Sequence, residues 1–484
     1  MKIIFHIIFF LTLTFLINSN FLRKLASSNY DYSNYNAVKT NEDIEEGNTL
    51  TSTTADQSVV YITASDKTIT KANIVKQSGE SSNIENSEFY GVNAAILVNG
   101  GKLAISGGTI ETKAKGANAI CSTNSGEVTI TGTTITSTAT SSGRGLHATY
   151  GGKITASKVI VSSTGGSCAT LATDRGEGTV SCSECNLTTN GAGSPLIYST
   201  GEITVEKTTG TSNGAQAVVV EGKNKAIVME SSDLKCTGVG NRGDVDKCGI
   251  MLYQSMSGDA DTGTSTFNCA SSSIEILSTS IVSSTAPMFF ITNTEANINL
   301  EGCNFTYGSG IFLSAAGTSE WGTSGSNGGD ITLTLNNQQI TGNFVVDSSS
   351  GLSIVLKQNS KIKGKINSEG TAARLSIKVD STSSIELTGN SFYTSLEAED
   401  NAKLINGSFT WTQTEEKEIS KSSGNNGGGE GGDPPGKPGE GKPGDFPGEG
   451  GPDAGKNQTN NFSSSIKSKW NNIIFGLCIL LVIV

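Results

Sequence analysis

The feature that most constrains the fold is a repeat with a period near 25 residues. An apolar position that follows small residues recurs in steps of 24, 26, 23, 27, 22 and 32, at Ile96, Ile120, Leu146, Ala169, Leu196, Val218 and Ile250. The first apolar residue after a Gly-polar turn recurs in steps of 25, 26, 26, 23 and 24, at Leu103, Val128, Ile154, Val180, Ile203 and Ile227. Two landmarks with nearly the same period indicate one repeated structural unit.

Each unit contains three short runs of alternating apolar and polar residues, such as "TIET", "NAIC" and "VTIT" within residues 106–138. Gly, Ser, Asn and Thr separate the runs, and no stretch of ten residues has helical spacing. The economical solution winds each unit into one coil of three strands and stacks the coils in parallel. The sequence therefore predicts an all-β fold, a single parallel β-helix with about 25 residues per coil.

Composition agrees with a thin core, because hydrophobic residues are only 35% of the chain while glycines number 59. The formal net charge of −11 repels phosphate backbones, so nucleic acid is not an expected partner.

The stretch "GANAICSTNSGEVTITGTTITSTATSSGRGLHATYGGKITASKVIVSSTG" resembles passenger segments of pertactin-like autotransporter adhesins, and more broadly the right-handed parallel β-helix (pectin-lyase-like) superfamily. The resemblance covers residues 55–412 and implies a right-handed coil. It says much about fold and little about function. The chain departs from bacterial autotransporters because no alternating membrane-barrel segments follow the repeats.

The predicted organisation has five parts. Residues 1–28 read as a signal peptide cleaved between 19 and 28, with a retained membrane anchor as the alternative. Residues 29–54 are expected to form an N-terminal cap or polar leader, and residues 55–420 the β-helix with its C-terminal cap. Residues 421–472 are Gly/Pro-rich and predict a disordered stalk.

The hydrophobic tail, residues 473–484, is short for a membrane span. It follows a small-residue triplet that begins at Ser463, the pattern of a GPI-attachment signal, and a tail anchor is the alternative. Either anchor predicts a protein on the outer face of the plasma membrane.

Eight of the nine cysteines precede the tail, an even set that suits an oxidising compartment. Cys236 and Cys248 bracket a loop that a disulfide would staple, and Cys182, Cys185, Cys269 and Cys303 are the other disulfide candidates. Some of the eight are alternatively buried thiols. N-glycosylation sequons begin at Asn186, Asn304, Asn406, Asn457 and Asn461, and "CNLT" and "CNFT" look like one position of the repeat.

No catalytic constellation is evident. His147 occupies an alternating strand position where other units carry Cys121 or Ile197, and the arginines lie units apart without a column of Asp beside them. Asp259 and Asp261 form only a fragment of a calcium loop, so no metal or other cofactor is predicted.

Two aromatic residues, Trp321 and Tyr253, are the candidates for contact with a ligand, because Trp321 lies in a Gly/Ser-rich insertion. The sequence predicts a non-enzymatic surface protein for adhesion or structural display. Its expected partners are extracellular or cell-surface glycans or proteins, and repeated weak contacts add along a rigid face. The alternatives are a polysaccharide lyase or glycoside hydrolase and a coat protein without a specific ligand.

Overall fold

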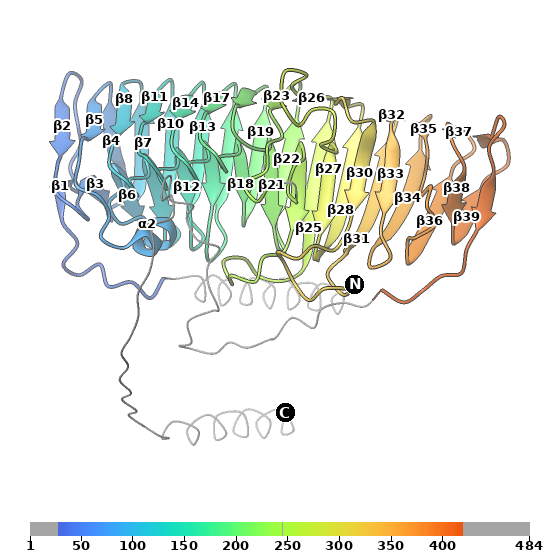
Figure 1. Ribbon diagram of the computed structural model, residues 1–484. Coiled ribbons are helices and arrows are strands. Elements are labelled where there is room, and N and C mark those ends of the chain that lie inside the picture. Colours follow the sequence, from blue (N-terminus) through green and yellow to red (C-terminus); the bar gives the residue numbers. More distant parts are fainter. Residues whose placement is uncertain (1–27, 244, 420–484) are drawn as a thin grey trace, which may run out of the picture. The chain divides into compact units, whose positions relative to one another are not determined.

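The computed structural model describes residues 28–419 except Asp244, and these residues form an all-β body of long parallel sheets (Figure 1). Its one α-helix among the described residues is α2 (Ile84–Tyr90). The chain passes in turn through three long sheets, A, B and C, and then returns to sheet A. The strand pairings of these sheets are parallel in the described residues. This topology is consistent with a parallel β-helix.

The strands of each sheet follow one another in register. Sheet A comprises β1 (Ala37–Thr40), β3 (Ser58–Ile62), β6 (Ile96–Asn99), β9 (Ile120–Thr123), β12 (Leu146–Ala148), β15 (Leu171–Thr173), β18 (Ile197–Ser199), β21 (Val218–Glu221), β24 (Ile250–Tyr253), β27 (Phe289–Thr292), β30 (Ile311–Ala315) and β33 (Asn343–Val346). Sheet B comprises β4 (Lys67–Thr70), β7 (Lys102–Ser106), β10 (Glu127–Thr131), β13 (Lys153–Ser157), β16 (Thr179–Ser183), β19 (Glu202–Glu206), β22 (Lys225–Met229), β25 (Thr264–Ala270), β28 (Thr294–Glu301), β31 (Gly329–Asn336), β34 (Gly351–Lys357), β36 (Arg374–Val379) and β39 (Ser395–Ala398).

Sheet C comprises β2 (Thr49–Ser52), β5 (Asn73–Lys76), β8 (Thr109–Thr112), β11 (Thr134–Ser137), β14 (Ile160–Ser163), β17 (Asn186–Thr189), β20 (Thr209–Ser212), β23 (Asp233–Cys236), β26 (Ser273–Ile276) and β29 (Asn304–Thr306). Two small sheets complete the C-terminal part, one of β32 (Gln339–Thr341), β35 (Lys361–Gly364), β37 (Ser384–Leu387) and β40 (Lys403–Ile405), the other of β38 (Ser391–Tyr393) and β41 (Trp411–Gln413).

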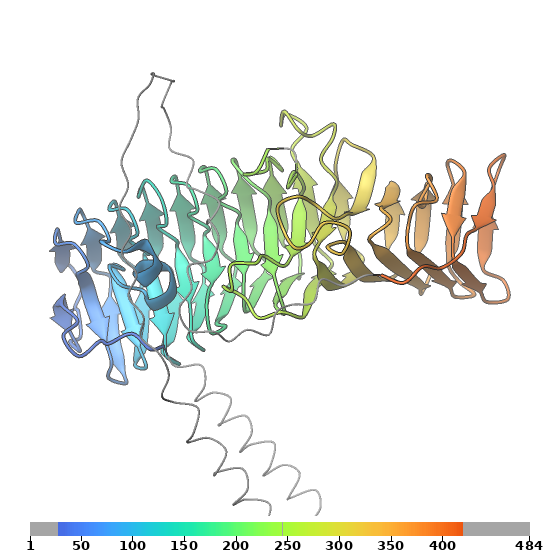
Figure 2. The ribbon, with the colours of Figure 1, turned by 60° about the horizontal axis from the view of Figure 1, so that its bottom comes forward.

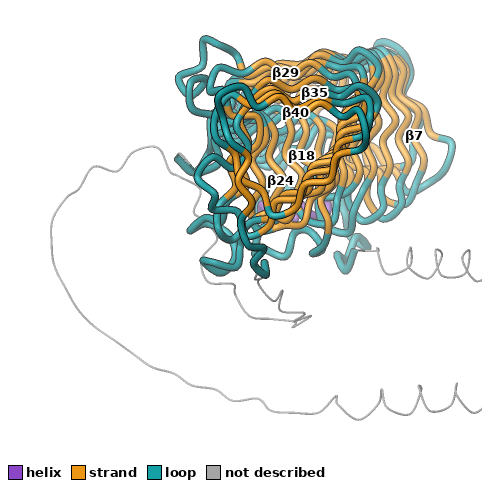
Figure 3. The backbone as a smooth tube through the Cα atoms, turned by 90° about the vertical axis from the view of Figure 1, so that its right-hand side faces the viewer, coloured by secondary structure: helices purple, strands orange, loops and turns teal. Residues whose placement is uncertain are grey.

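Alternating side chains explain why sheets B and C form. In β10 the inward residues Val128 and Ile130 are buried and the three residues around them are exposed. The inward side chains of all three sheets meet in one continuous apolar core, around which the strands lie in Figure 3. Because only one face of sheet B is buried, its strands keep the period-2 pattern.

Sheet A differs because both of its faces are covered. Its strands read as runs of buried residues, such as Val218–Glu221, in which all four residues are buried. The N-terminal segment, α2 and the loops that flank the sheet A strands lie over its outward face (Figure 2). Outward residues therefore form two further apolar clusters, one around Leu97 and Cys121 and one around Met251 and Phe290.

Two-sided burial explains where the first predicted landmark, which falls in sheet A, is wrong. Leu146 pairs with Leu171 rather than with Ala169, and Leu171 pairs with Ile197 rather than with Leu196. In sheet B, Ile203 pairs with Ala226, so that Ile227 points outward. The other predicted positions of both landmarks pair as expected.

The predicted N-terminal cap, residues 29–54, contains two strands. Strands β1 and β2, within the predicted cap, pair with β3 and β5 and form the terminal strands of sheets A and C. At the other end, residues 407–419 include β41, and the Lys417 N–H donates to the Ala373 carbonyl. Both segments lie at the ends of sheets, where a cap is needed.

The corner between sheets B and C has left-handed backbone in successive units. Gly132, Lys158, Glu184 and Lys207 occupy it with φ between 47° and 63°. Glycine adopts this conformation most readily, yet lysine and glutamate also take it here. The Cys182–Cys185 disulfide brackets one of these corners.

Candidate functional site

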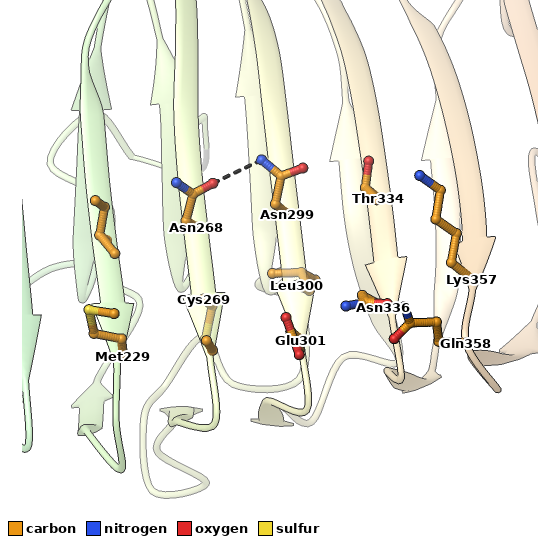
Figure 4. A pocket seen from close by; sticks show the side chains of 12 residues that line it. Met229, Asn268, Cys269, Asn299, Leu300, Glu301, Thr334, Asn336, Lys357 and Gln358 are labelled. Carbon is orange, nitrogen blue, oxygen red and sulfur yellow. Dashed lines mark hydrogen bonds between the residues drawn. The ribbon is translucent and has the colours of Figure 1, made fainter.

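A shallow groove of about 560 Å³ lies on the outward face of sheet B, across β22, β25, β28, β31 and β34 (Figure 4). Its lining combines amide, hydroxyl, charged and apolar groups, and consists of Ile227, Met229, Asn268, Cys269, Ala270, Asn299, Leu300, Glu301, Thr334, Asn336, Lys357 and Gln358. Sequence reasoning did not single out any outward residue of this groove.

An asparagine ladder forms the centre of the groove. Asn268, Asn299 and Thr334 occupy the same register position on β25, β28 and β31. The Asn299 Nδ2 donates a 2.8 Å hydrogen bond to the Asn268 Oδ1, drawn in Figure 4. Within the described part of the chain no other hydrogen bond uses these two amides, so an Asn268 N–H donor and the Asn299 Oδ1 acceptor still face solvent.

Such a row suits hydroxyl groups, because a hydroxyl both donates and accepts a hydrogen bond. Ile227 and Met229 at one end of the groove offer apolar surface beside the amides. The groove contains one acidic and one basic lining residue, Glu301 and Lys357, and no aromatic ring. Its chemistry is that of a weak site for a polar, hydroxyl-rich molecule.

A second cluster of polar groups lies on the outward face of sheet A, in the part that α2 covers. The Arg144 guanidinium lies 3.2 Å from the Asp174 carboxylate and 3.6 Å from that of Glu88, which α2 supplies. The side chains of Arg144, Asp174 and Glu88 are only 8%, 4% and 16% exposed. Two acidic side chains thus lie beside Arg144, although the sequence shows no column of Asp beside the arginines.

Burial shifts the titration of this cluster. Desolvation raises the pKa of Asp174 to about 8. The charge of Arg144 opposes this shift, and the charges of Asp259 and Glu88 add to it. His147 is fully buried in the same area, and neither ring nitrogen has a hydrogen-bond partner among the described residues. Burial, together with the nearby Arg144 charge, lowers the His147 pKa well below its ordinary value, so the ring is neutral.

His147 pairs with Cys121 on one side, as predicted, and with Ala172 on the other. The expected neighbour position Ile197 points inward, and Tyr198 takes the corresponding outward place. His147 is thus one of a row of outward side chains on sheet A that other segments cover.

A third group of polar side chains fastens the loop after β24. The Tyr198 and Tyr253 hydroxyls donate to the Glu221 Oε2 at 2.6 and 2.7 Å, and Ser255 donates to Oε1. Burial raises the pKa of Glu221 above its ordinary value, although these three donors oppose the shift. The carboxylate is thus occupied by protein donors.

The predicted ligand-binding residues lie together, Trp321 buried and Tyr253 partly buried. The Trp321 and Tyr253 rings meet edge to face with centroids 5.1 Å apart, and Trp321 is 6% exposed. Arg242 lies 5.6 Å from the centroid of the Trp321 ring. Because neighbours cover it, the Trp321 ring packs in the outer apolar cluster of sheet A and presents no free face for a sugar.

Asp259 and Asp261, the weak calcium candidates, have different surroundings. The Asp259 carboxylate accepts from Arg175 at 3.1 and 3.2 Å, whereas Asp261 is exposed and its backbone carbonyl accepts from Lys223. Within residues 28–419, Asp244 excepted, no group of three or more acidic, His or Cys residues is arranged to hold a metal ion.

Four of the candidate cysteines form disulfides, Cys182–Cys185 and Cys269–Cys303. The staple between Cys236 and Cys248 is absent, and both remain free buried thiols. The reason is geometric, since Cys236 packs in the inner core while Cys248 packs in the outer cluster of sheet A.

The sequons at Asn186 and Asn304 do share one position of the repeat. Both residues are exposed and begin strands of sheet C, where register runs from Asn186 through Thr209, Asp233 and Ser273 to Asn304. Asn406 is exposed as well. The candidates Asn457, Asn461 and Ser463, with both predicted targeting segments, lie outside the described residues.

Among residues with a described structure, no helix has the length and apolar character needed to cross a membrane. Comparison of the chain with models of protein families, with curated proteins and with solved structures gave no match.

Proposed function

We propose that the chain is a non-enzymatic cell-surface protein whose sheet B face binds glycans, in support of adhesion or surface display. The observation that carries this proposal is the ladder of Asn268 and Asn299, whose remaining donor and acceptor face solvent in an open groove. Thr334 extends the ladder with a hydroxyl. A site without an aromatic ring binds one sugar weakly, so many copies on one surface are needed for firm attachment.

The same proposal includes the finer fold assignment, a right-handed parallel β-helix of the pectin-lyase-like class with about 25 residues per coil. The parallel sheets and the repeated A, B, C order support it. Crossovers between parallel strands are right-handed in about 98% of cases. The amino-terminal signal would direct the chain into the secretory pathway. The C-terminal GPI signal or tail anchor would then hold the body at the outer face of the plasma membrane.

The test displays the full chain on cells and measures capture of fluorescent oligosaccharides from a panel. Binding should be lost in the double variant Asn268→Ala/Asn299→Ala and kept in Thr129→Ala/Thr155→Ala, a matched pair on outward positions of β10 and β13 in the same sheet. Capture of no glycan, or equal capture by both variants, contradicts the proposal.

One observation favours the alternative of a polysaccharide lyase or glycoside hydrolase. Arg144, Asp174 and Glu88 bring acidic and basic groups together, and a carboxyl group with a raised pKa suits a general acid. Because these three groups pair with one another under α2, we rank this function second. Incubation of the full chain with uronate and neutral polysaccharides tests it, since products absent from Asp174→Asn would establish an enzyme.

A further inference from the structure

The groove on sheet B is balanced in charge. Glu301 and Lys357 are its one acidic and one basic lining residue, and they flank Asn336 in one register row. The neighbouring row of Asn268, Asn299 and Thr334 is uncharged. A site for a polyanion needs an excess of cations, most effectively arginines that grip carboxylates in two-point contacts. The lining contains no arginine.

Three other cations on outward positions of sheet B are paired with carboxylates. On outward positions of sheet B, Lys225 lies 3.2 Å from Glu202, Lys378 lies 3.1 Å from Glu397, and Arg374 contacts Asp330. The chain as a whole carries a net charge of −11. Local and global charge therefore both disfavour a uronate polymer.

The row also has a direction. Its three side chains come from consecutive strands, which lie about 4.8 Å apart. A glycan that crosses the strands advances by about one strand spacing per sugar when its chain is extended, so each sugar meets one side chain of the row. A glycan that follows a single strand would meet only one of the three.

We propose that the groove binds a neutral, extended glycan laid across β25, β28 and β31, and that it discriminates against polyuronates. This inference rests on the proposed function and names the ligand class of that site. The ladder supplies a donor and an acceptor to neighbouring hydroxyls, while Ile227 and Met229 contact the C–H surface of the chain.

The experiment titrates the full chain, in detergent, with four oligosaccharides of equal length: a neutral β-1,4-glucan, its N-acetylglucosamine counterpart, an oligogalacturonate and a glucosamine oligomer. We expect binding of at least one neutral probe, with a dissociation constant that does not change with salt. Asn268→Ala/Asn299→Ala should weaken it about 30-fold, because two neutral hydrogen bonds of about 1 kcal/mol each are lost. Thr129→Ala/Thr155→Ala should leave it unchanged.

The outcomes separate the two proposals. Tighter binding of the oligogalacturonate or the glucosamine oligomer, lost in Asn268→Ala/Asn299→Ala, overturns the neutral ligand and leaves the glycan-binding function standing. Binding of no probe overturns both. Neutral binding that is equal in both double variants overturns the groove as the site. The unfolding midpoint of each variant shows that a loss of binding is not a loss of fold.

Discussion

The Arg175 guanidinium lies 3.8 Å from the centroid of the Phe89 ring and donates to the Asp259 carboxylate. It thereby joins α2 to the loop after β24, the two elements that cover the middle of sheet A. Cation–π contacts contribute about 0.5–2 kcal/mol and partly exposed ion pairs about 0–1 kcal/mol.

Arg175→Leu should therefore lower the free energy of unfolding by about 1–2 kcal/mol and speed amide exchange in residues 84–90. Urea unfolding and hydrogen exchange measure the two effects. Lys207→Leu is the control, because Lys207 is more exposed and pairs only with Glu206 and Glu230. Equal effects of the two substitutions would contradict a fastening role for Arg175.

The contribution of Asp174 to the free energy of unfolding should fall as pH rises. Its folded pKa of about 8 lies above the ordinary value of 3.8, so the folded state holds a proton that the unfolded state releases. The contribution is complete below about pH 4 and declines by up to about 1.4 kcal/mol per pH unit until about pH 8. In Asp174→Asn this decline should be absent. Urea titrations at several pH values compare the two, and parallel curves would refute the assignment.

His147 should act in the opposite direction. Its folded pKa lies well below 6.5, so the unfolded chain takes up a proton first as pH falls. The contribution of His147 to stability should thus fall as pH decreases below 6.5. His147→Leu, which has no titratable ring, should lack this fall when it is compared with the unsubstituted protein over the same pH range. The same variant should be at least as stable at pH 7.5, because both ring nitrogens lack a partner in the described structure. The unfolding midpoints of the unsubstituted protein and of His147→Leu, measured from pH 7.5 to pH 5, test this prediction.

The two disulfides should contribute unequally. Cys269 and Cys303 are separated by 34 residues, Cys182 and Cys185 by three. Loop-closure entropy favours the longer loop by about 2 kcal/mol at 25 °C. Cys269→Ala/Cys303→Ala should therefore lower the free energy of unfolding by more than Cys182→Ala/Cys185→Ala. Reversal of this order in urea unfolding would show that constraint of the left-handed corner at Glu184 outweighs loop length.

Most of the fold could be predicted because the repeat is carried by alternating residues. Leu103, Val128, Ile154, Val180 and Ile203 align in sheet B as expected. The errors at Ala169 and Leu196 fall in sheet A, where neighbouring residues are all buried and alternation gives no register. Continuous apolar runs such as "VVV" and "FFI" are the available signal for a sheet covered on both faces.

The candidate site could not be predicted to the same extent. Asn268 and Asn299 belong to units of unequal length, so their common row appears only once strand register is known. Arg144, Asp174 and Glu88 come from three separate segments, and α2 brings Glu88 to the other two. Trp321 drew attention by its Gly/Ser surroundings, yet the fold covers it.

Strand register also survives large insertions. Val218 and Ile250 are paired neighbours in sheet A although 32 residues separate them, and the extra residues form a loop outside the sheet. Such a fold can gain or lose loops over sheet A while the rows of sheets B and C stay aligned. Two sides of one molecule are therefore free to evolve at different rates, one by changing loop length and the other by single substitutions along a fixed row.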